Sequence, residues 1–125
     1  MGRIKKDIEI NSKKFWTLFD TGARNTYIIE DVAAQLPVFE LKKIESVSLG
    51  GKVHLIKKDC RLEASVEGYN IRTNARIIDV LGDDEEGNKI QVLIGALAMQ
   101  EWGIRLIPEE EKLDMTHYPK EFVEY

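Results

Sequence analysis

An aspartate directly follows an apolar run near the start of the chain. Residues 15–19 read Phe-Trp-Thr-Leu-Phe, and Asp20, Thr21, Gly22 and Ala23 come next. Inside a buried strand an ionised carboxylate without a partner is strongly disfavoured, so Asp20 is expected where the strand ends. There Gly22 lets backbone approach closely, and Thr21 offers a hydroxyl for a fixed hydrogen bond. The pattern predicts a strand that delivers a carboxylate to an open cleft.

The tripeptide Asp-Thr-Gly does not establish such a site by itself. Asp and Gly both favour tight turns, and so short a motif also arises by chance. Asp20 could equally cap a helix or a turn. The remainder of the chain therefore decides between a site and a turn.

Composition restricts the class of protein. A chain of 125 residues with 43% hydrophobic residues suits one globular domain with a single core. The net charge of -4 argues against nucleic acid as the main partner, and no apolar run is long enough to cross a membrane. The start of the sequence has no apolar leader, and the single cysteine, Cys60, cannot form an intrachain disulfide. A cytoplasmic protein is expected.

Most of the chain is predicted to form short strands separated by turns. The β-rich runs are residues 4–10, 15–19, 26–29, 46–49, 52–56, 61–66, 71–78, 91–94 and 104–107. Helices are predicted at 30–36, ended by Pro37, and at 96–102, ended by Gly103. The expected fold is mainly β, a barrel-like single domain over residues 1–107 with two short helices. Residues 108–125 then form an extension that either packs on the domain or lies at a dimer interface.

Two glycines join the runs 46–49 and 52–56. A two-residue turn between β-rich runs requires positive φ angles, which Gly50 and Gly51 adopt without strain. A β-hairpin with these glycines at its tip is predicted.

No metal or cofactor is expected. His54 and His117 lack the spacing of metal ligands, and no glycine-rich phosphate loop is present. The acidic run 82–88 has two interpretations, a solvated loop or a calcium site, and its spacing favours the solvated loop.

The order of these features resembles that of retropepsin-like aspartic peptidases, the superfamily of retroviral proteases and small cellular relatives. An apolar strand enters Asp-Thr-Gly-Ala at 20–23, and Thr26 follows. A helical segment and the two-glycine hairpin come next, then Val-Leu-Ile-Gly at 92–95 before a short helix, and Gly-Ile-Arg-Leu at 103–106. The resemblance covers about residues 15–106 and implies a closed β-barrel of the acid-protease type.

The resemblance implies an aspartic endopeptidase. One Asp-Thr-Gly supplies one catalytic carboxylate, Asp20, so a homodimer would be needed to form the dyad that activates water against a polypeptide substrate. Thr21 would hydrogen-bond across the dimer axis, and Gly22 would accept hydrogen bonds from the substrate backbone. The residues implied to support the loop are Ala23, Thr26, Ile94 and Gly95, and those implied to form a flap over the substrate are Leu49, Gly50, Gly51 and Lys52.

The sequence departs from the retroviral pattern after Asp-Thr-Gly-Ala. Retroviral enzymes commonly place acidic residues there to bind the substrate backbone, whereas this chain has Arg24 and Asn25. Substrate specificity is therefore expected to differ. Two alternatives stay open: a catalytically silent β-barrel that binds or assembles, and an enzyme that matures or pairs only with another protein.

Overall fold

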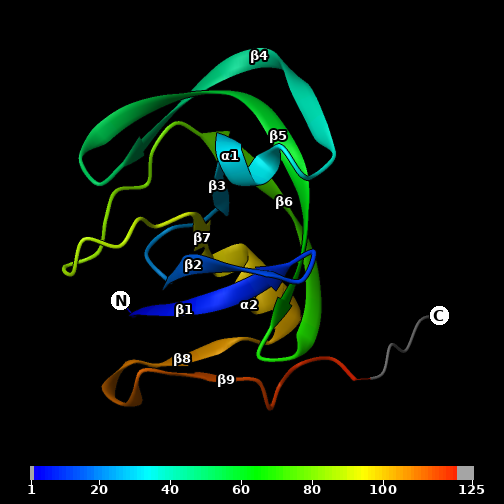
Figure 1. Cartoon of the computed structure of the whole chain (residues 1–125), viewed down its shortest axis with the longest axis vertical. Coiled ribbons are helices and arrows are strands. Elements are labelled where there is room, and N and C mark those ends of the chain that lie inside the picture. Colours follow the sequence, from blue (N-terminus) through cyan, green and yellow to red (C-terminus); the bar gives the residue numbers. More distant parts are fainter. Residues whose placement is uncertain (1, 121–125) are drawn as a thin grey trace.

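The chain forms a closed β-barrel, which confirms the predicted fold class. The computed structural model describes residues 2–120. Its main sheet has seven strands in the order β1-β2-β7-β3-β6-β5-β4, and a further pairing of β1 with β5 closes the ring (Figure 1). These strands are β1 (Arg3–Ile10), β2 (Lys13–Asp20), β3 (Tyr27–Ile29), β4 (Val38–Leu49), β5 (Lys52–Val66), β6 (Tyr69–Ile78) and β7 (Val92–Ile94).

The first two strands, predicted from residues 4–10 and 15–19, form an N-terminal hairpin. β1 and β2 pair antiparallel from Ile10↔Lys13 to Arg3↔Asp20. Asn11 and Ser12 make the turn, both with positive φ angles (50° and 66°), the geometry that a two-residue hairpin turn requires. The hairpin therefore places the N-terminal segment beside Asp20.

The predicted hairpin of residues 46–56 is the tip of a much longer one. β4 has 12 residues and β5 has 15, so the separately predicted strands 52–56 and 61–66 are one continuous strand. The polar residues 57–59 suggested a break between these strands. In the structure β5 runs through them without interruption, and the irregularity lies in β4, whose register shifts between Glu40, paired with Lys58, and Glu45, paired with Ile56. The hairpin crosses the top of the barrel in Figure 1.

Two helices flank the sheet. α1 (Glu30–Ala33) has a single turn and is shorter than predicted, because residues 34–36 continue only as a hydrogen-bonded turn. α2 (Ala96–Trp102) has the predicted bounds. Gly103 ends it in the left-handed region at φ 66°, where a Cβ atom would overlap the carbonyl group of His117.

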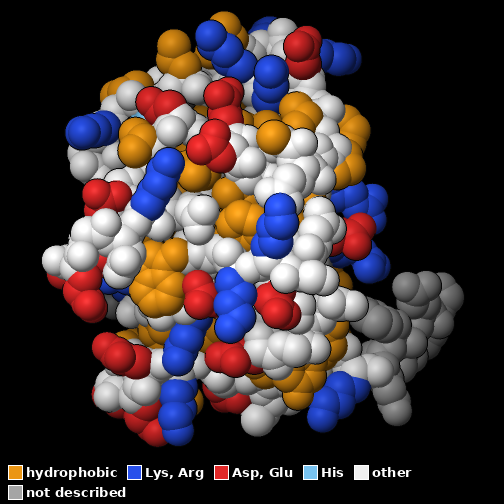
Figure 2. All heavy atoms as spheres, in the orientation of Figure 1, with side chains coloured by type: hydrophobic (Ala, Val, Ile, Leu, Met, Phe, Trp, Pro, Cys, Tyr) orange, Lys and Arg blue, Asp and Glu red, His pale blue; other side chains and the backbone are white. Residues whose placement is uncertain are grey.

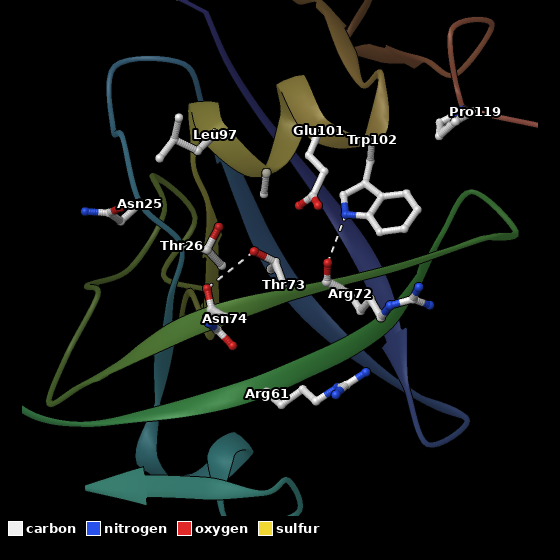
Figure 3. A pocket seen from close by; sticks show the side chains of 11 residues that line it. Asn25, Thr26, Arg61, Arg72, Thr73, Asn74, Leu97, Glu101, Trp102 and Pro119 are labelled. Atoms are coloured by element: carbon white, nitrogen blue, oxygen red, sulfur yellow. Dashed lines mark hydrogen bonds between the residues drawn. The ribbon is translucent and has the colours of Figure 1, made fainter. Parts of the chain in front are cut away.

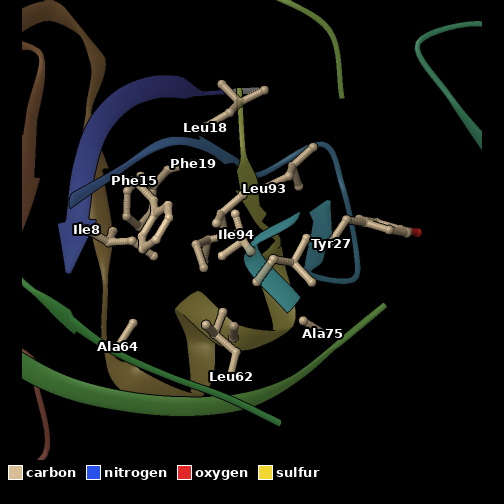
Figure 4. Packing of buried hydrophobic residues seen from close by; sticks show 14 of the residues in the cluster. Ile8, Phe15, Leu18, Phe19, Tyr27, Leu62, Ala64, Ala75, Leu93 and Ile94 are labelled. Atoms are coloured by element: carbon tan, nitrogen blue, oxygen red, sulfur yellow. The ribbon is translucent and has the colours of Figure 1, made fainter. Parts of the chain in front are cut away.

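The core fills the barrel interior (Figure 4). All three residues of β7 are buried, as expected for a strand covered on both faces. In β5, by contrast, Cys60, Leu62 and Ala64 are buried while Arg61 and Glu63 between them are exposed. Large exposed hydrophobic side chains gather on the outer hairpin, among them Phe39, Ile44, Val53 and Leu55, and hydrophobic side chains are visible among charged ones in that part of Figure 2.

The C-terminal segment packs on the barrel as far as the structure describes it. β8 (Arg105–Ile107), the 3-10 turn η1 (Pro108–Glu110) and β9 (Lys112–Asp114) form a two-stranded sheet. Met115 is buried, and the Tyr118 hydroxyl donates to the carbonyl of Asn70 at 2.5 Å. The last part of the predicted extension, residues 121–125, lies outside the described residues. The domain boundary at residue 107 stays a prediction.

Across residues 2–120, no helix is both long and apolar enough to traverse a bilayer.

Candidate active site

Asp20 is the last residue of β2, as the sequence pattern predicted. β2 runs parallel to β7, with Phe19 paired to Ile94, and the chain leaves the sheet immediately afterwards. The Asp20 side chain is only 13% exposed. Its Oδ1 accepts a hydrogen bond from the Gly22 backbone N–H at 2.8 Å, and the Ala23 N–H donates to the Asp20 carbonyl at 3.2 Å. This turn fixes the orientation of the carboxylate.

The loop after Asp20 rests on the junction between β7 and α2. The first two N–H groups of α2 donate to loop carbonyls, Ala96 to Ala23 at 2.7 Å and Leu97 to Arg24 at 3.1 Å. The Gly95 N–H donates to the buried Thr26 hydroxyl at 3.2 Å. Five backbone groups of the loop and the junction are thereby hydrogen-bonded, and the loop is held at a fixed height above the core.

Gly95 is required by this close approach. A Cβ atom there would overlap the carbonyl of Asn25 and would lie 2.8 Å from the carbonyl oxygen of Arg24. Its φ of -94° suits any residue, so space alone selects glycine. Thr26 and Gly95, which the resemblance implied as supports of the loop, hydrogen-bond to each other, and Ile94 pairs with Phe19 in β2; their supporting role stays a prediction.

Thr21 is engaged within its own chain. Its Oγ1 accepts from the Gly2 N–H at 2.8 Å, and its backbone N–H donates to the Gly2 carbonyl at 3.0 Å. Arg3 follows, with Nε 3.2 Å from Oδ2 of Asp20. The N-terminal strand therefore supplies a cation to the carboxylate, a contact for which the sequence offered no local signal.

The tip of the long hairpin lies over a cleft that contains Asp20. Gly50 and Gly51 have φ angles of 58° and 79°, as the turn prediction required. Leu49, Gly50 and Lys52 line the cleft, whereas Gly51 does not. The cleft measures about 700 Å³, and its other lining residues are Arg3, Leu18, Asp20, Gly22, Ala23, Arg24, Tyr27, Ser48, His54, Val80, Leu81, Gly82 and Leu93. Of the residues predicted to form and support the loop, Gly22 and Ala23 line this cleft, whereas Thr21, Thr26, Ile94 and Gly95 do not.

His54 was missed as a cleft residue. Strand alternation places it on the inner face of β5, between exposed Val53 and Leu55. Its Nδ1 lies 2.6 Å from Oδ1 of Asp79, which follows the end of β6. The hydrogen bond from His54 lowers the pKa of Asp79, more than burial raises it. Alternation could have identified the inward side chain, but not its distant partner.

The acidic loop forms a hydrogen-bonded turn around Asp84. Its carboxylate accepts from the N–H groups of Glu86 and Asn88, at 2.9 and 2.8 Å, and from the Trp16 indole at 2.9 Å. Within residues 2–120, no cluster of His, Cys, Asp or Glu side chains has the arrangement of a metal site.

A second hollow, of about 600 Å³, lies between α2 and β6, away from Asp20 (Figure 3). Thr26 borders it from below the active-site loop, and the Trp102 indole donates to the Arg72 carbonyl at 2.9 Å at its other end. Trp102 is thus largely buried with its polar group satisfied.

Solved structures of retroviral protease-like domains share this architecture. The retroviral protease-like domain of Ddi1 from Leishmania major matches with a TM-score of 0.67, covering 93% of this chain and 90% of that one at 13% identity. EIAV protease in complex with the inhibitor HBY-793 matches with a TM-score of 0.58, covering 84% of this chain and 92% of that one at 17% identity. This chain has the retropepsin-like fold.

The retropepsin-like fold also occurs within a larger viral protein. The foamy viral protease-reverse transcriptase, solved with an RNA/DNA hybrid, matches with a TM-score of 0.53 over 80% of this chain at 16% identity. This chain covers only 12% of that protein. No protein-family model matches the sequence, and the search of curated proteins found no match. At sequence identities of 13–17%, these structural matches establish the fold alone. Any chemistry has to be argued from the residues at the site.

Proposed function

We propose that this chain is an aspartic endopeptidase that acts as a homodimer. The observation that carries the proposal is the position of Asp20 in a retropepsin-like fold, at the end of β2 and in the cleft beneath the Leu49–Lys52 hairpin tip. A carboxylate held by a backbone N–H, beneath a hairpin that can close, suits the activation of water in a sheltered site.

The proposal requires two copies of the chain. Each supplies one Asp20, and a two-fold axis would bring the two carboxylates together. Thr21 and Gly22 are exposed in the single chain, so this part of the loop is accessible to a partner copy. Thr21 would then exchange its contact with Gly2, or share it, to reach across the axis.

Two adjacent carboxylates cannot both ionise easily, so the pair would hold one proton. The ionised Asp20 would remove a proton from the bound water as its oxygen attacks the scissile carbonyl carbon. The protonated Asp20 would hydrogen-bond to the carbonyl oxygen as it gains negative charge. When the tetrahedral intermediate collapses, the Asp20 that took the water's proton would give it to the leaving nitrogen, and the C–N bond breaks. The apparent pKa values would belong to the pair.

The substrate would bind as an extended strand. Peptide capture by main-chain hydrogen bonds suits a cleft between a loop and a β-hairpin. The Gly22 carbonyl is the proposed acceptor for a substrate N–H, and the tip at Gly50 is proposed to cover the peptide. No side chain at Gly22 or Gly50 obstructs that approach.

The direct test is peptide cleavage by purified protein. The wild-type chain is incubated with a mixed peptide library at several pH values between about pH 2 and pH 7, because pairs of carboxylates that share one proton titrate in acid solution, and products are identified by mass spectrometry. Asp20→Asn should abolish cleavage, while Asp7→Asn, the same change on the outer strand β1, should not. Cleavage that survives in Asp20→Asn ends the proposal.

Mixing experiments test the shared site. If each dimer has one dyad, adding an equal amount of Asp20→Asn protein should cut wild-type activity to about half, because mixed dimers lack one carboxylate. An unchanged rate would show that each chain acts alone. Sedimentation analysis at the same concentrations measures the dimer directly.

One observation favours the silent binding module instead. In the single chain the polar groups of the Asp20 loop already have partners: Arg3 forms an ion pair with the Asp20 carboxylate, and the Gly2 N–H donates to the Thr21 hydroxyl. A loop satisfied without a partner can serve structure alone. Arg3→Ala separates the two: an enzyme should keep or gain activity when the cation leaves, whereas a structural ion pair should show only a stability change, with no cleavage before or after.

A further inference from the structure

The cleft around Asp20 is cationic although the chain is acidic. The whole chain has a net charge of -4. Yet Arg3, Arg24, Lys52 and His54 line the cleft, and Asp20 is the one acidic residue among its described lining. Charge of one sign concentrated in a cleft raises the local concentration of ligands of the opposite sign.

Two of the three Arg and Lys side chains that line the cleft have no ion-pair partner among residues 2–120. Arg3 is paired with Asp20, and His54 with Asp79. Among residues 2–120, neither Arg24 nor Lys52 takes part in an ion pair: the pairs found are Arg3–Asp20, Lys5–Glu85, His54–Asp79, Arg61–Glu63, Arg76–Glu45, Lys89–Asp31 and Lys112–Glu110. Both are also exposed, so their charges are free to meet a ligand.

The two cations come from two different elements that line the cleft. Arg24 lies in the loop two residues after Gly22, and its carbonyl is fixed by the N–H of Leu97 at 3.1 Å. Lys52 begins β5 at the hairpin tip, paired with Leu49 across the turn. A peptide lying between the loop and the tip would therefore meet a cleft lined by both the Arg24 guanidinium and the Lys52 ammonium.

We propose that the cleft selects acidic peptides, with Asp or Glu side chains flanking the scissile bond. The inference rests on the proposed peptidase function and names its substrate class. In a two-fold dimer each half contributes one Arg24 and one Lys52, so acidic residues are favoured on both sides of the bond. Carboxylate recognition by a guanidinium is among the stronger charged contacts in proteins.

The first test changes only the substrate. Peptides with one cleavable core are made with Glu, Gln or Lys at the flanking positions. Each Glu should raise kcat/KM over Gln by about threefold to tenfold, Lys should lower it, and the spread should shrink as salt increases. Equal rates, or a preference for Lys, would overturn the inference while leaving the peptidase proposal standing.

The second test changes the protein. Arg24→Glu and Lys52→Glu should each reverse the preference towards Lys-containing peptides. Lys13→Glu, the same charge change at the exposed start of β2 and outside the described cleft lining, should preserve it. A reversal in Lys13→Glu as well would assign the effect to net charge and reject the cleft. Circular dichroism confirms that each variant is folded.

Binding separates this inference from the proposed activity. Fluorescence anisotropy of labelled Glu, Gln and Lys peptides with Asp20→Asn protein measures the preference without cleavage. Glu-selective binding supports the inference even if the wild type cleaves nothing, in which case only the peptidase proposal fails. Equal binding of the three peptides, or equally strong displacement of the Glu peptide by a single-stranded DNA oligonucleotide, would reject a cleft that selects acidic peptides.

Discussion

The carbonyl group of Asn25 occupies the place where a side chain on Gly95 would lie. This contact joins the loop that carries Asp20 to the junction of β7 and α2. It explains why the apolar strand of residues 92–94 is followed by glycine, and it makes the height of the Asp20 loop depend on one backbone position.

Gly95→Ala is expected to destabilise the fold by about 1–3 kcal/mol, the range for inserting a methyl group into a packed region. The neighbouring atoms are backbone, at 2.6 Å for the Asn25 carbonyl carbon, and cannot rotate away. Urea unfolding measures the change. Gly68→Ala is the control, since its Cβ would meet nothing within 4 Å and only its φ of 83° opposes the substitution. Because backbone strain alone accounts for any loss in Gly68→Ala, the deciding result is Gly95→Ala itself: a variant as stable as the wild type would contradict the close-approach explanation.

The Thr26 hydroxyl should also contribute to the stability of the fold. It is 3% exposed and accepts the N–H of Gly95. Thr26→Val keeps the shape but leaves that buried N–H without an acceptor, at a cost of about 1–3 kcal/mol. Thr26→Ser retains the acceptor and should lose less. If Val and Ser variants unfold at the same urea concentration, the hydrogen bond contributes nothing measurable.

The sequence predicted the parts of the site that local patterns encode. An apolar run ending at Asp20 must end at a strand terminus, and Gly50-Gly51 must turn, because each follows from the chemistry of neighbouring residues. α2 was bounded correctly because Gly103 permits its left-handed end. The resemblance to retropepsin-like peptidases then supplied the barrel, which the structural comparisons confirm.

Other features depend on partners far apart in the chain. Strand β4 extends back to Val38 because β5 offers it a pairing edge, although its own exposed residues lack alternation. β9 exists through its pairing with β8. The contacts of Arg3 with Asp20 and of His54 with Asp79 span 17 and 25 residues. Local patterns in a single sequence do not predict contacts between residues this far apart in the chain.

Cys60 is expected to be unreactive in the folded protein. It is fully buried, and burial, helped by the charge of Asp59, raises the pKa of its thiol to about 11. Only the thiolate reacts with disulfide reagents. Labelling with an aromatic disulfide at pH 8 should therefore be slow in buffer and fast in urea. Cys60 is the sole cysteine, so the signal is unambiguous, and rapid labelling of folded protein would disprove the burial.

The contact between His54 and Asp79 should make the free energy of unfolding depend on pH in acid solution. It ties the hairpin strand β5 to the segment after β6, with Nδ1 and Oδ1 2.6 Å apart. Because the hydrogen bond from His54 lowers the pKa of Asp79 below its ordinary 3.8, ionised Asp79 stabilises the fold above that value. The stabilisation is lost as pH falls through the lower, folded-state pKa.

Asp79→Asn measures the contribution. The Asp79 side chain is 73% exposed, so solvent screening limits the difference in unfolding free energy to at most about 1 kcal/mol. That difference should shrink below about pH 4, as wild-type Asp79 becomes protonated. Asp7→Asn on β1 should show no such link to His54. A wild-type advantage that grows as the pH falls below about 4 would contradict the lowered pKa of Asp79, and with it the assignment of His54 as the donor.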